Sequence, residues 1–321
     1  MRSVLIWLDA FQRRHAVAGV PVAVAKKFAS DRVSNLAALV AFYAFFSMFP
    51  LLLAFVSILG FVLDDNPELR EEVVDSALAQ IPVIGAQIGD QVQPLSGSGL
   101  ALAVGLIGAL WAGLGVTLAL GRAFAAIWDV PRLEQLNGVK ARLRGLAVLA
   151  ILGLTLIAST AVTGLAIGGG IGPAAQRVAA IAVSLLVNGV TLLVVFALLS
   201  VRPRSVRALL PGVAIAAVGL LALQTLGGWY VDRAVAGASA TYGTFALVIG
   251  LLSWLLVGAN LLLGAAEVNV VLRRRLWPRA LTGELEPADH RALRQAAEAA
   301  REDRRQQIAV SFDEDLPSQQ D

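Results

Sequence analysis

The sequence of 321 residues has no cysteine, only two histidines and few charged side chains. The lack of cysteine excludes disulfides, zinc–thiolate sites, thiol redox chemistry and cysteine nucleophiles. The two histidines, His15 and His290, lie in opposite polar ends of the chain, which disfavours a histidine-based metal or catalytic site. Only 15% of the residues are charged, against about 25% in an average soluble domain, whereas 57% are hydrophobic. This composition is typical of a chain that buries most of its surface in lipid.

Long apolar runs predict an all-α, polytopic membrane protein with six transmembrane helices, because about 20 apolar residues cross a hydrocarbon core of about 30 Å. The predicted membrane domain is 36–272. Its spans cover residues 36–63, 100–122, 145–168, 178–199, 209–230 and 243–272.

The segments outside these spans have distinct compositions. Residues 1–35 predict an amphipathic helix in the membrane interface, with a solvated helix as the alternative. No apolar core followed by a small-residue cleavage site is apparent there, so we expect no cleavable signal peptide. Residues 64–99 form an acidic loop. Residues 273–321 form a polar tail in which Pro287–Ile308 predicts a solvated helix and Ser311–Asp321 predicts disorder.

The distribution of positive charge predicts the orientation. Of 26 lysine and arginine residues, only Arg70, Arg177 and Arg233 fall in the first, third and fifth connectors. The positive-inside rule therefore places both termini, with the second and fourth connectors, in the cytoplasm. The acidic loop is then external. The basic residues of the tail could touch anionic lipid or RNA, but their mixture with acids favours a solvated face, so we expect no nucleic-acid partner.

The sixth span contains polar residues at a seven-residue spacing, namely Ser253, Asn260 and Glu267, which therefore share one helix face. A carboxylate on a membrane helix is costly unless it faces protein or water, so Glu267 is a candidate for a proton or substrate pathway. Arg122, near the inner end of the second span, is the predicted ion-pair partner. A purely structural pair is the alternative.

Other polar residues fall near the middle of predicted spans. Tyr43 and Ser47 lie in the first span, and Asn188 lies in the fourth. With Asn260, they predict a polar cavity between the first, fourth and sixth spans, where transporters bind their substrates. The alternative is that the asparagines only form hydrogen bonds between helices, each contributing on the order of 0.6 kcal/mol. Pro50 predicts a kink in the first span.

Four short motifs occur in a particular order along the chain. They are Ala41-Phe42-Tyr43-Ala44-Phe45-Phe46-Ser47-Met48-Phe49-Pro50, Leu210-Pro211-Gly212, Tyr242-Gly243-Thr244 and Leu263-Gly264-Ala265-Ala266-Glu267-Val268-Asn269. In this order the chain resembles the YihY/BrkB family of bacterial inner-membrane proteins over roughly residues 25 to 280. The family pattern often reads Leu-Gly-Ala-Glu, and here Ala266 is an additional residue before Glu267.

The resemblance implies an inner-membrane protein, whose relatives have been labelled ribonuclease, serum-resistance factor and transporter, or linked to the movement of envelope lipids. The sequence lacks the histidine-rich run and the phosphate-binding loop of common metal nucleases and nucleotide pumps. We therefore expect no enzymatic activity, no cofactor and no metal. A secondary transporter or lipid-handling protein is the preferred hypothesis, and a membrane scaffold is the alternative. The expected partners are membrane lipids and a lipid or small solute as substrate, with self-association left open.

Overall fold

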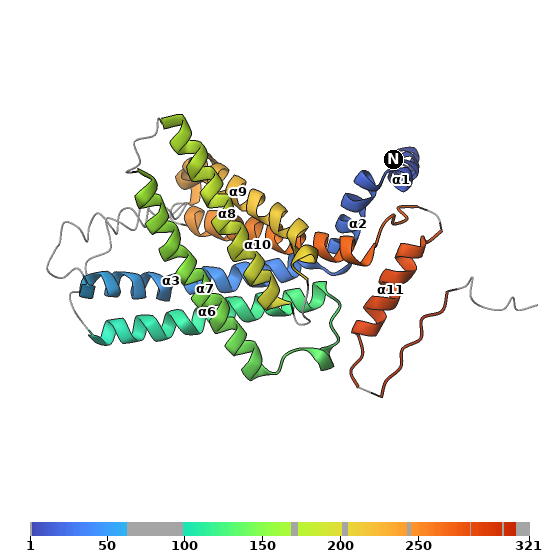
Figure 1. Cartoon of the computed structure of the whole chain (residues 1–321), viewed down its shortest axis with the longest axis horizontal. Coiled ribbons are helices and arrows are strands. Elements are labelled where there is room, and N and C mark those ends of the chain that lie inside the picture. The colour runs from blue at the N-terminus through green and yellow to red at the C-terminus, as the bar shows by residue number, and fades with distance from the viewer. Residues whose placement is uncertain are drawn as a thin grey trace, which may run out of the picture.

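A computed structural model describes residues 2–62, 99–167, 173–200, 205–242, 245–282, 284–303 and 305–312. Every regular element within these ranges is helical (Figure 1). The helices are α1 (Arg2–Arg14), α2 (Ala16–Ser30), α3 (Val33–Val62), α6 (Gly99–Ile127), α7 (Gly138–Ile167), α8 (Pro173–Leu199), α9 (Val206–Tyr242), α10 (Phe245–Arg274) and α11 (Pro287–Ala299), with one 3-10 turn at Arg132–Glu134.

Five of the described helices are long and apolar enough to cross a membrane. The qualifying segments are Val33–Ala54, Leu102–Ile127, Ile181–Leu199, Val206–Leu226 and Val248–Arg274. They correspond to the first, second, fourth, fifth and sixth predicted spans. The third predicted span falls in α7 and stays a prediction. The acidic loop 64–99 lies outside the described residues except at Gly99. Of the segment predicted to be disordered, Ser311–Asp321, only residues 311 and 312 are described.

The helix pair α3 and α6 packs through glycines of α6. A Cβ atom added to Gly105 would lie 2.9 Å from the backbone of Ala54, and one on Gly115 would lie 2.9 Å from the ring of Tyr43. Both glycines therefore let the α3 helix approach closely. Pro50 lies inside α3, and its ring faces Gly108 of α6. The kink predicted at Pro50 stays a prediction.

The helices α9 and α10 cross in backbone contact near Gly212. A Cβ atom added there would lie 2.2 Å from the carbonyl oxygen of Ala265, so only glycine fits. The N–H of Gly212 donates to Oδ1 of Asn269, 2.7 Å away. Two of the sequence motifs, Leu210-Pro211-Gly212 and the segment ending in Asn269, therefore form one helix crossing.

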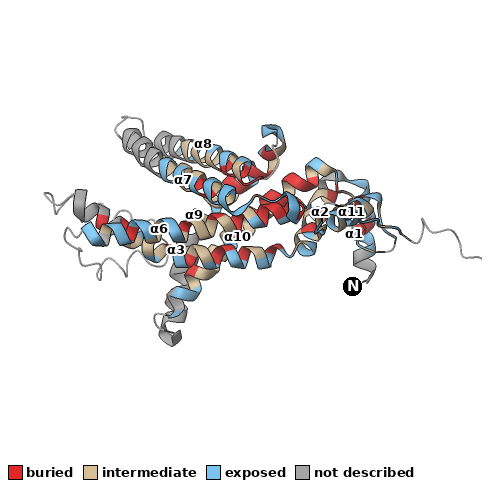
Figure 2. Ribbon diagram, turned by 90° about the horizontal axis from the view of Figure 1, so that it is seen from below, coloured by how far each residue is buried: buried red, intermediate tan, exposed pale blue. Residues whose placement is uncertain are grey.

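Buried residues gather where α3, α6, α8, α9 and α10 meet (Figure 2). Many large hydrophobic side chains are exposed on the outer surface. Phe124 of α6 and Phe196 of α8 are fully buried and pack edge to face, with ring centroids 4.9 Å apart. By contrast, Trp111 is 81% exposed on the outside of α6. An apolar exterior on long apolar helices is the arrangement that suits contact with lipid.

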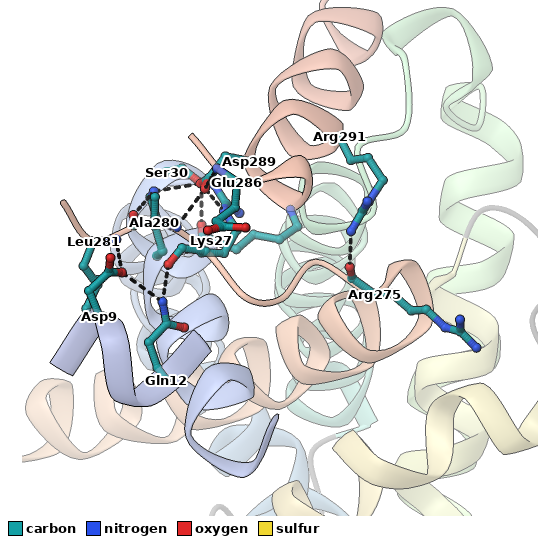
Figure 3. Close-up of polar contacts among 12 residues, drawn as sticks. Asp9, Gln12, Lys27, Ser30, Arg275, Ala280, Leu281, Glu286, Asp289 and Arg291 are labelled. Carbon is teal, nitrogen blue, oxygen red and sulfur yellow. Dashed lines mark hydrogen bonds and ion pairs between the residues drawn. The ribbon is translucent and has the colours of Figure 1, made fainter. Parts of the chain in front are cut away.

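The N-terminal and C-terminal segments dock on each other at the end of the molecule where α1, α2 and α11 lie (Figures 1 and 3). Asp9 of α1 accepts the N–H of Leu281 at 2.8 Å, and Gln12 donates to the carbonyl oxygen of Arg279 at 2.6 Å. Asp289 of α11 accepts from Lys26 at 2.7 Å and from Arg279 at 2.6 Å. We call these contacts the terminal clasp.

The clasp corrects the predicted picture of the tail. The helix predicted from Pro287 to Ile308 ends at Ala299, and its first turn is docked rather than solvated, since Ala288 and Asp289 are buried. Burial alone would raise the pKa of Asp289, but hydrogen bonds from Lys26, the N–H of Ala280 and Arg279 hold it below its ordinary value. Asp289 is therefore a structural anion of this interface.

Candidate functional site

Glu267 lies on α10 and is fully buried, with 0% of its surface exposed. Neither of its carboxylate oxygens accepts a hydrogen bond from the described residues. The nearest cation is Lys27 of α2, whose Nζ atom lies 3.8 Å from Oε2 of Glu267. Burying a carboxylate without a hydrogen-bond donor costs free energy. In membrane proteins such a carboxylate commonly belongs to a pathway for a substrate, an ion or a proton.

Lys27 is the centre of a cluster of carboxylates. Its side chain is only 4% exposed, and besides Glu267 it contacts Asp31 at the end of α2 and Oδ2 of Asp129, the latter at 3.4 Å. Burial alone would lower the pKa of Lys27. The three carboxylates outweigh burial and raise this pKa above its ordinary value, so Lys27 stays positively charged at neutral pH.

Arg274, at the last turn of α10, supplies the second cation of the cluster. Its guanidinium pairs with Asp129 and donates to the carbonyl oxygen of Trp128 at 2.6 Å and to Gln295 of α11 at 2.7 Å. Burial raises the pKa of Asp129 above its ordinary value, although Lys27 and Arg274 act in the opposite direction. Arg274 thus ties the ends of α6 and α10 to the tail.

Three helices end beside this cluster through residues in the left-handed conformation. These are Arg32 after α2, Asp129 after α6 and Arg275 after α10, with φ of 53°, 46° and 52°. After Asp129, the N–H of Val130 donates to the carbonyl oxygen of Ala125, and after Arg275, the N–H of Leu276 donates to that of Val271. In this type of helix end, glycine is favoured at the left-handed position. At position 129 the chain instead holds an aspartate, whose carboxylate reaches both cations of the cluster.

The charge balance of the cluster determines what it can do. It contains three carboxylates, those of Asp31, Asp129 and Glu267, and two cations, Lys27 and Arg274. With every group ionised, the cluster carries one excess negative charge. Glu267 is the most buried of its three carboxylates. A proton or a cationic group of a substrate would neutralise that excess. Such an arrangement suits reversible binding of one positive charge.

The predicted pair of Arg122 and Glu267 is not the one that forms. The structure places Lys27 against Glu267, whereas Arg122 is exposed and lines a separate cavity with Arg142 and Arg144. The reason is that α2 packs along α10 and brings the Lys27 ammonium to Glu267 from outside the apolar bundle. Depth along a span, on which the prediction relied, does not determine which helix face a side chain shares.

The predicted midplane residues form bonds within their own helices. Ser47 donates to the carbonyl oxygen of Ala44 at 2.7 Å, Asn260 to that of Leu256 at 2.8 Å, and Asn188 to Ser184 at 3.4 Å. In addition, Tyr43 packs against Gly115, and Ser253 is half-buried on α10. Among the described residues these side chains form no hydrogen bond with one another. A shared polar cavity therefore stays a prediction, and the hydrogen bonds described for Asn188 and Asn260 run within their own helices rather than between helices.

Sequence reasoning identified Glu267 but missed its surroundings. Neither Lys27 nor Asp129 was among the candidate residues predicted from the sequence. The available signals were the i, i+4 spacing of Lys27 and Asp31, and the position of Asp129 directly after a span. Neither signal indicates that the two segments meet at Glu267, because that meeting depends on helix packing.

The motifs and the cluster can be compared with known proteins. A family model described as "Virulence factor BrkB" matches residues 24–289, which include every residue of the charge cluster. The chain belongs to the BrkB family. The match begins at the second half of α2, so the family's extent includes Lys27 as well as Glu267. It ends at Asp289 of the terminal clasp, so the matched region includes the second half of α2 and the first part of the tail.

A curated relative of this BrkB-family chain comes from Bacillus subtilis (strain 168) and bears the description "Putative ribonuclease-like protein YfkH". It is 33% identical over 93 residues, which cover 28% of the present chain and 34% of the relative. The match thus spans about a third of the relative's length. No solved structure matches the chain.

Proposed function

We propose that this BrkB-family protein spans the bacterial inner membrane six times and moves a lipid or small solute by means of the charge cluster around Glu267. The five qualifying helices support a multi-pass membrane protein. We assign the one remaining crossing, the third along the chain, to α7. The apolar part of this helix follows Lys140, Arg142 and Arg144, and such a basic start is typical of the cytoplasmic side. Both termini are then cytoplasmic, and the charge cluster lies near the cytoplasmic end of the bundle.

The observation that carries this proposal is the buried Glu267 carboxylate, which has no hydrogen-bond donor among the described residues and belongs to a cluster with one excess negative charge. Taking up a proton or a cationic group changes the electrostatic energy of that cluster. A protein can use such a change to favour one of two helix arrangements, provided that the bound charge stabilises one of them more. A structural ion pair of Glu267 and Lys27 is the alternative.

The experiment compares the wild-type protein with the Glu267→Gln variant in proteoliposomes. Two signals are followed, namely flipping of a fluorescent phospholipid and proton flux under an imposed pH gradient. We expect the Glu267→Gln substitution to remove the excess charge and to slow the active process at least tenfold. The matched control is Glu298→Gln, which changes an exposed carboxylate on α11. Full activity of the Glu267→Gln variant, or no movement of either probe by the wild type, would contradict the proposal.

We propose no enzymatic activity, in spite of the word "ribonuclease-like" in the name of the Bacillus relative. Within the part of the chain that the structure describes, no three His, Cys, Asp or Glu side chains are grouped so as to hold a metal ion. The test is incubation of the purified protein with labelled RNA, with and without divalent cations. Cleavage that is lost in the Asp129→Asn variant would contradict this part of the proposal.

A membrane scaffold is the second candidate, and the surface of α1 favours it. The polar side chains Asp9 and Gln12 are buried in the terminal clasp, whereas Ile6, Trp7 and Phe11 are exposed. In this second function the three side chains contact a partner protein, instead of inserting into the inner leaflet as predicted for an interfacial helix. If the liposome assays show no movement but Trp7→Ser releases a co-purifying protein, the scaffold function is favoured over transport.

A further inference from the structure

A cavity of about 220 Å³ lies between the end of α6, the start of α7 and the end of α8. It is smaller than the pockets of about 300 Å³ or more that enclose drug-sized ligands, so its size suits a headgroup rather than a whole lipid. Three arginines line it, Arg122 from α6 and Arg142 and Arg144 from α7. No acidic residue is among its lining residues, so the cavity has a strong positive charge.

The three guanidinium groups have different environments. Arg144 is half-buried and donates to the carbonyl oxygens of Leu198 and Ser200, at 3.3 and 3.1 Å, and is thereby fixed against the end of α8. Arg122 and Arg142 are exposed, and in the described structure neither forms an ion pair. Two cations without a paired anion line one cavity, beside a third that is held in place, and such a lining suits an anionic group such as a phosphate.

The start of α7 adds to the attraction for an anion. Gly138 and Ala141, both in its first turn, line the cavity. The backbone N–H groups at a helix start carry a partial positive charge, which favours a phosphate nearby. This contribution supplements the arginines.

The surroundings of the cavity indicate where the phosphate comes from. Next to the basic lining, α7 exposes the apolar side chains of Val139, Leu143 and Leu146, which are 65%, 61% and 39% exposed. The cavity lies where the apolar segments of α6 and α8 end, at Ile127 and Leu199, which is the level of the headgroups when such helices cross a bilayer. A soluble phosphate ester would leave Val139, Leu143 and Leu146 exposed to water, whereas the acyl chains of a lipid would cover them.

We propose that this cavity binds the phosphate of an anionic phospholipid from the inner leaflet, with its acyl chains along Leu143 and Leu146. Arg122 and Arg142 bind the phosphate, and Arg144 positions the end of α8 beside it. The binding is independent of the transport function proposed above, because the cavity shares no residue with the cluster around Glu267. It gives the protein a fixed lipid partner whether or not it moves lipid.

The test measures lipid binding to the full-length protein in detergent by native mass spectrometry. The probes are phosphatidylglycerol, zwitterionic phosphatidylcholine and inorganic phosphate. We expect phosphatidylglycerol to bind most tightly and R122Q/R142Q to weaken its binding about 30-fold, since each of these arginines loses a direct contact with the phosphate that contributes about 1 kcal/mol. The matched control is R207Q/R273Q, which removes two exposed arginines at the same end of the bundle but outside the cavity, and we expect less than about twofold change.

Three results would overturn the proposal. They are equal binding of phosphatidylcholine, binding of inorganic phosphate as tight as that of the lipid, or equal losses in the R122Q/R142Q and control variants. If the double variant does not fold, the single variants R122Q and R142Q replace it, each with an expected loss of about fivefold. An unchanged affinity in both single variants would likewise overturn the assignment.

Discussion

The Nζ atom of Lys27 lies 3.8 Å from Oε2 of Glu267 and 3.4 Å from Oδ2 of Asp129. One ammonium group therefore connects an N-terminal helix to the ends of two apolar helices. Because all three side chains are largely buried, the interaction is poorly screened by water or salt. The position of α2 against the bundle and the charge state of Glu267 are consequently linked.

The first prediction concerns this link. Replacing Lys27 by Met should lower the free energy of unfolding by about 3 kcal/mol, because Glu267 and Asp129 then lose a buried counter-charge. The double variant Lys27→Met/Glu267→Gln should be more stable than the sum of the single effects implies. The measurement is a double-mutant cycle by thermal or denaturant unfolding in detergent.

The matched cycle combines Arg122→Gln with Glu267→Gln. Since Arg122 is exposed in a separate cavity, its effect should add to that of Glu267 within about 0.5 kcal/mol. Strong coupling in this second cycle, together with additivity in the first, would show that the assigned partner of Glu267 is wrong.

The second prediction concerns the crossing of α9 and α10. Gly212→Ala should destabilise the protein by about 3 kcal/mol, since the new methyl group would overlap the carbonyl oxygen of Ala265. Asn269→Leu should cost about 2 kcal/mol, because the buried N–H of Gly212 loses its acceptor. The control is Gly189→Ala on α8, where an added Cβ meets nothing within 4 Å, and it should be neutral or slightly stabilising.

The third prediction concerns the terminal clasp. Asp289→Ala should increase hydrogen exchange in α1 and α2, because Lys26 and Arg279 lose their shared acceptor at a cost of about 2 kcal/mol. Glu298→Gln, at an exposed position of the same helix, is the control and should leave exchange unchanged. Exchange mass spectrometry of the full chain provides the measurement, and undisturbed protection of α1 in the Asp289→Ala variant would contradict the clasp.

The fourth prediction concerns the effect of acid on that clasp. The pKa values of Asp9 and Asp289 lie below their ordinary values, so each carboxylate contributes stability above the pKa of the unfolded chain. That stability is lost as the pH falls below the ordinary aspartate range and through the lowered pKa of the folded state. We expect α1 to stay protected at neutral and mildly acidic pH and to loosen only below about pH 4. Loosening between pH 6 and 7 would be inconsistent with these groups as the cause.

The fifth prediction concerns orientation. A reporter protein that is active only in the cytoplasm should be active when it is fused after Asp321, because the short basic connectors hold both ends of the chain on the cytoplasmic side. The same reporter placed in the acidic segment 64–99 should give the opposite result. A periplasmic carboxyl end would reverse the proposed orientation and remove the inner-leaflet assignment of the arginine-lined cavity.

The sequence by itself determined the class of the protein and the identity of its most unusual residue. Continuous apolar runs have few structural alternatives to membrane-crossing helices, because an unpaired backbone polar group is too costly in lipid. For the same reason, a carboxylate such as Glu267 within such a run is conspicuous without any knowledge of its neighbours. The motif Leu210-Pro211-Gly212 stood out through the resemblance to the YihY/BrkB family.

Only the tertiary structure decided which residues meet. Lys27 and Asp129 reach Glu267 because α2 packs on α10 and because α6 ends beside it, and neither fact follows from the pattern of either segment. The predicted partner Arg122 has suitable charge and depth, but it lies in the separate cavity between α6, α7 and α8. Periodicity sets the face that a helix presents, whereas the choice of neighbour depends on side-chain packing across many residues, which local sequence does not encode.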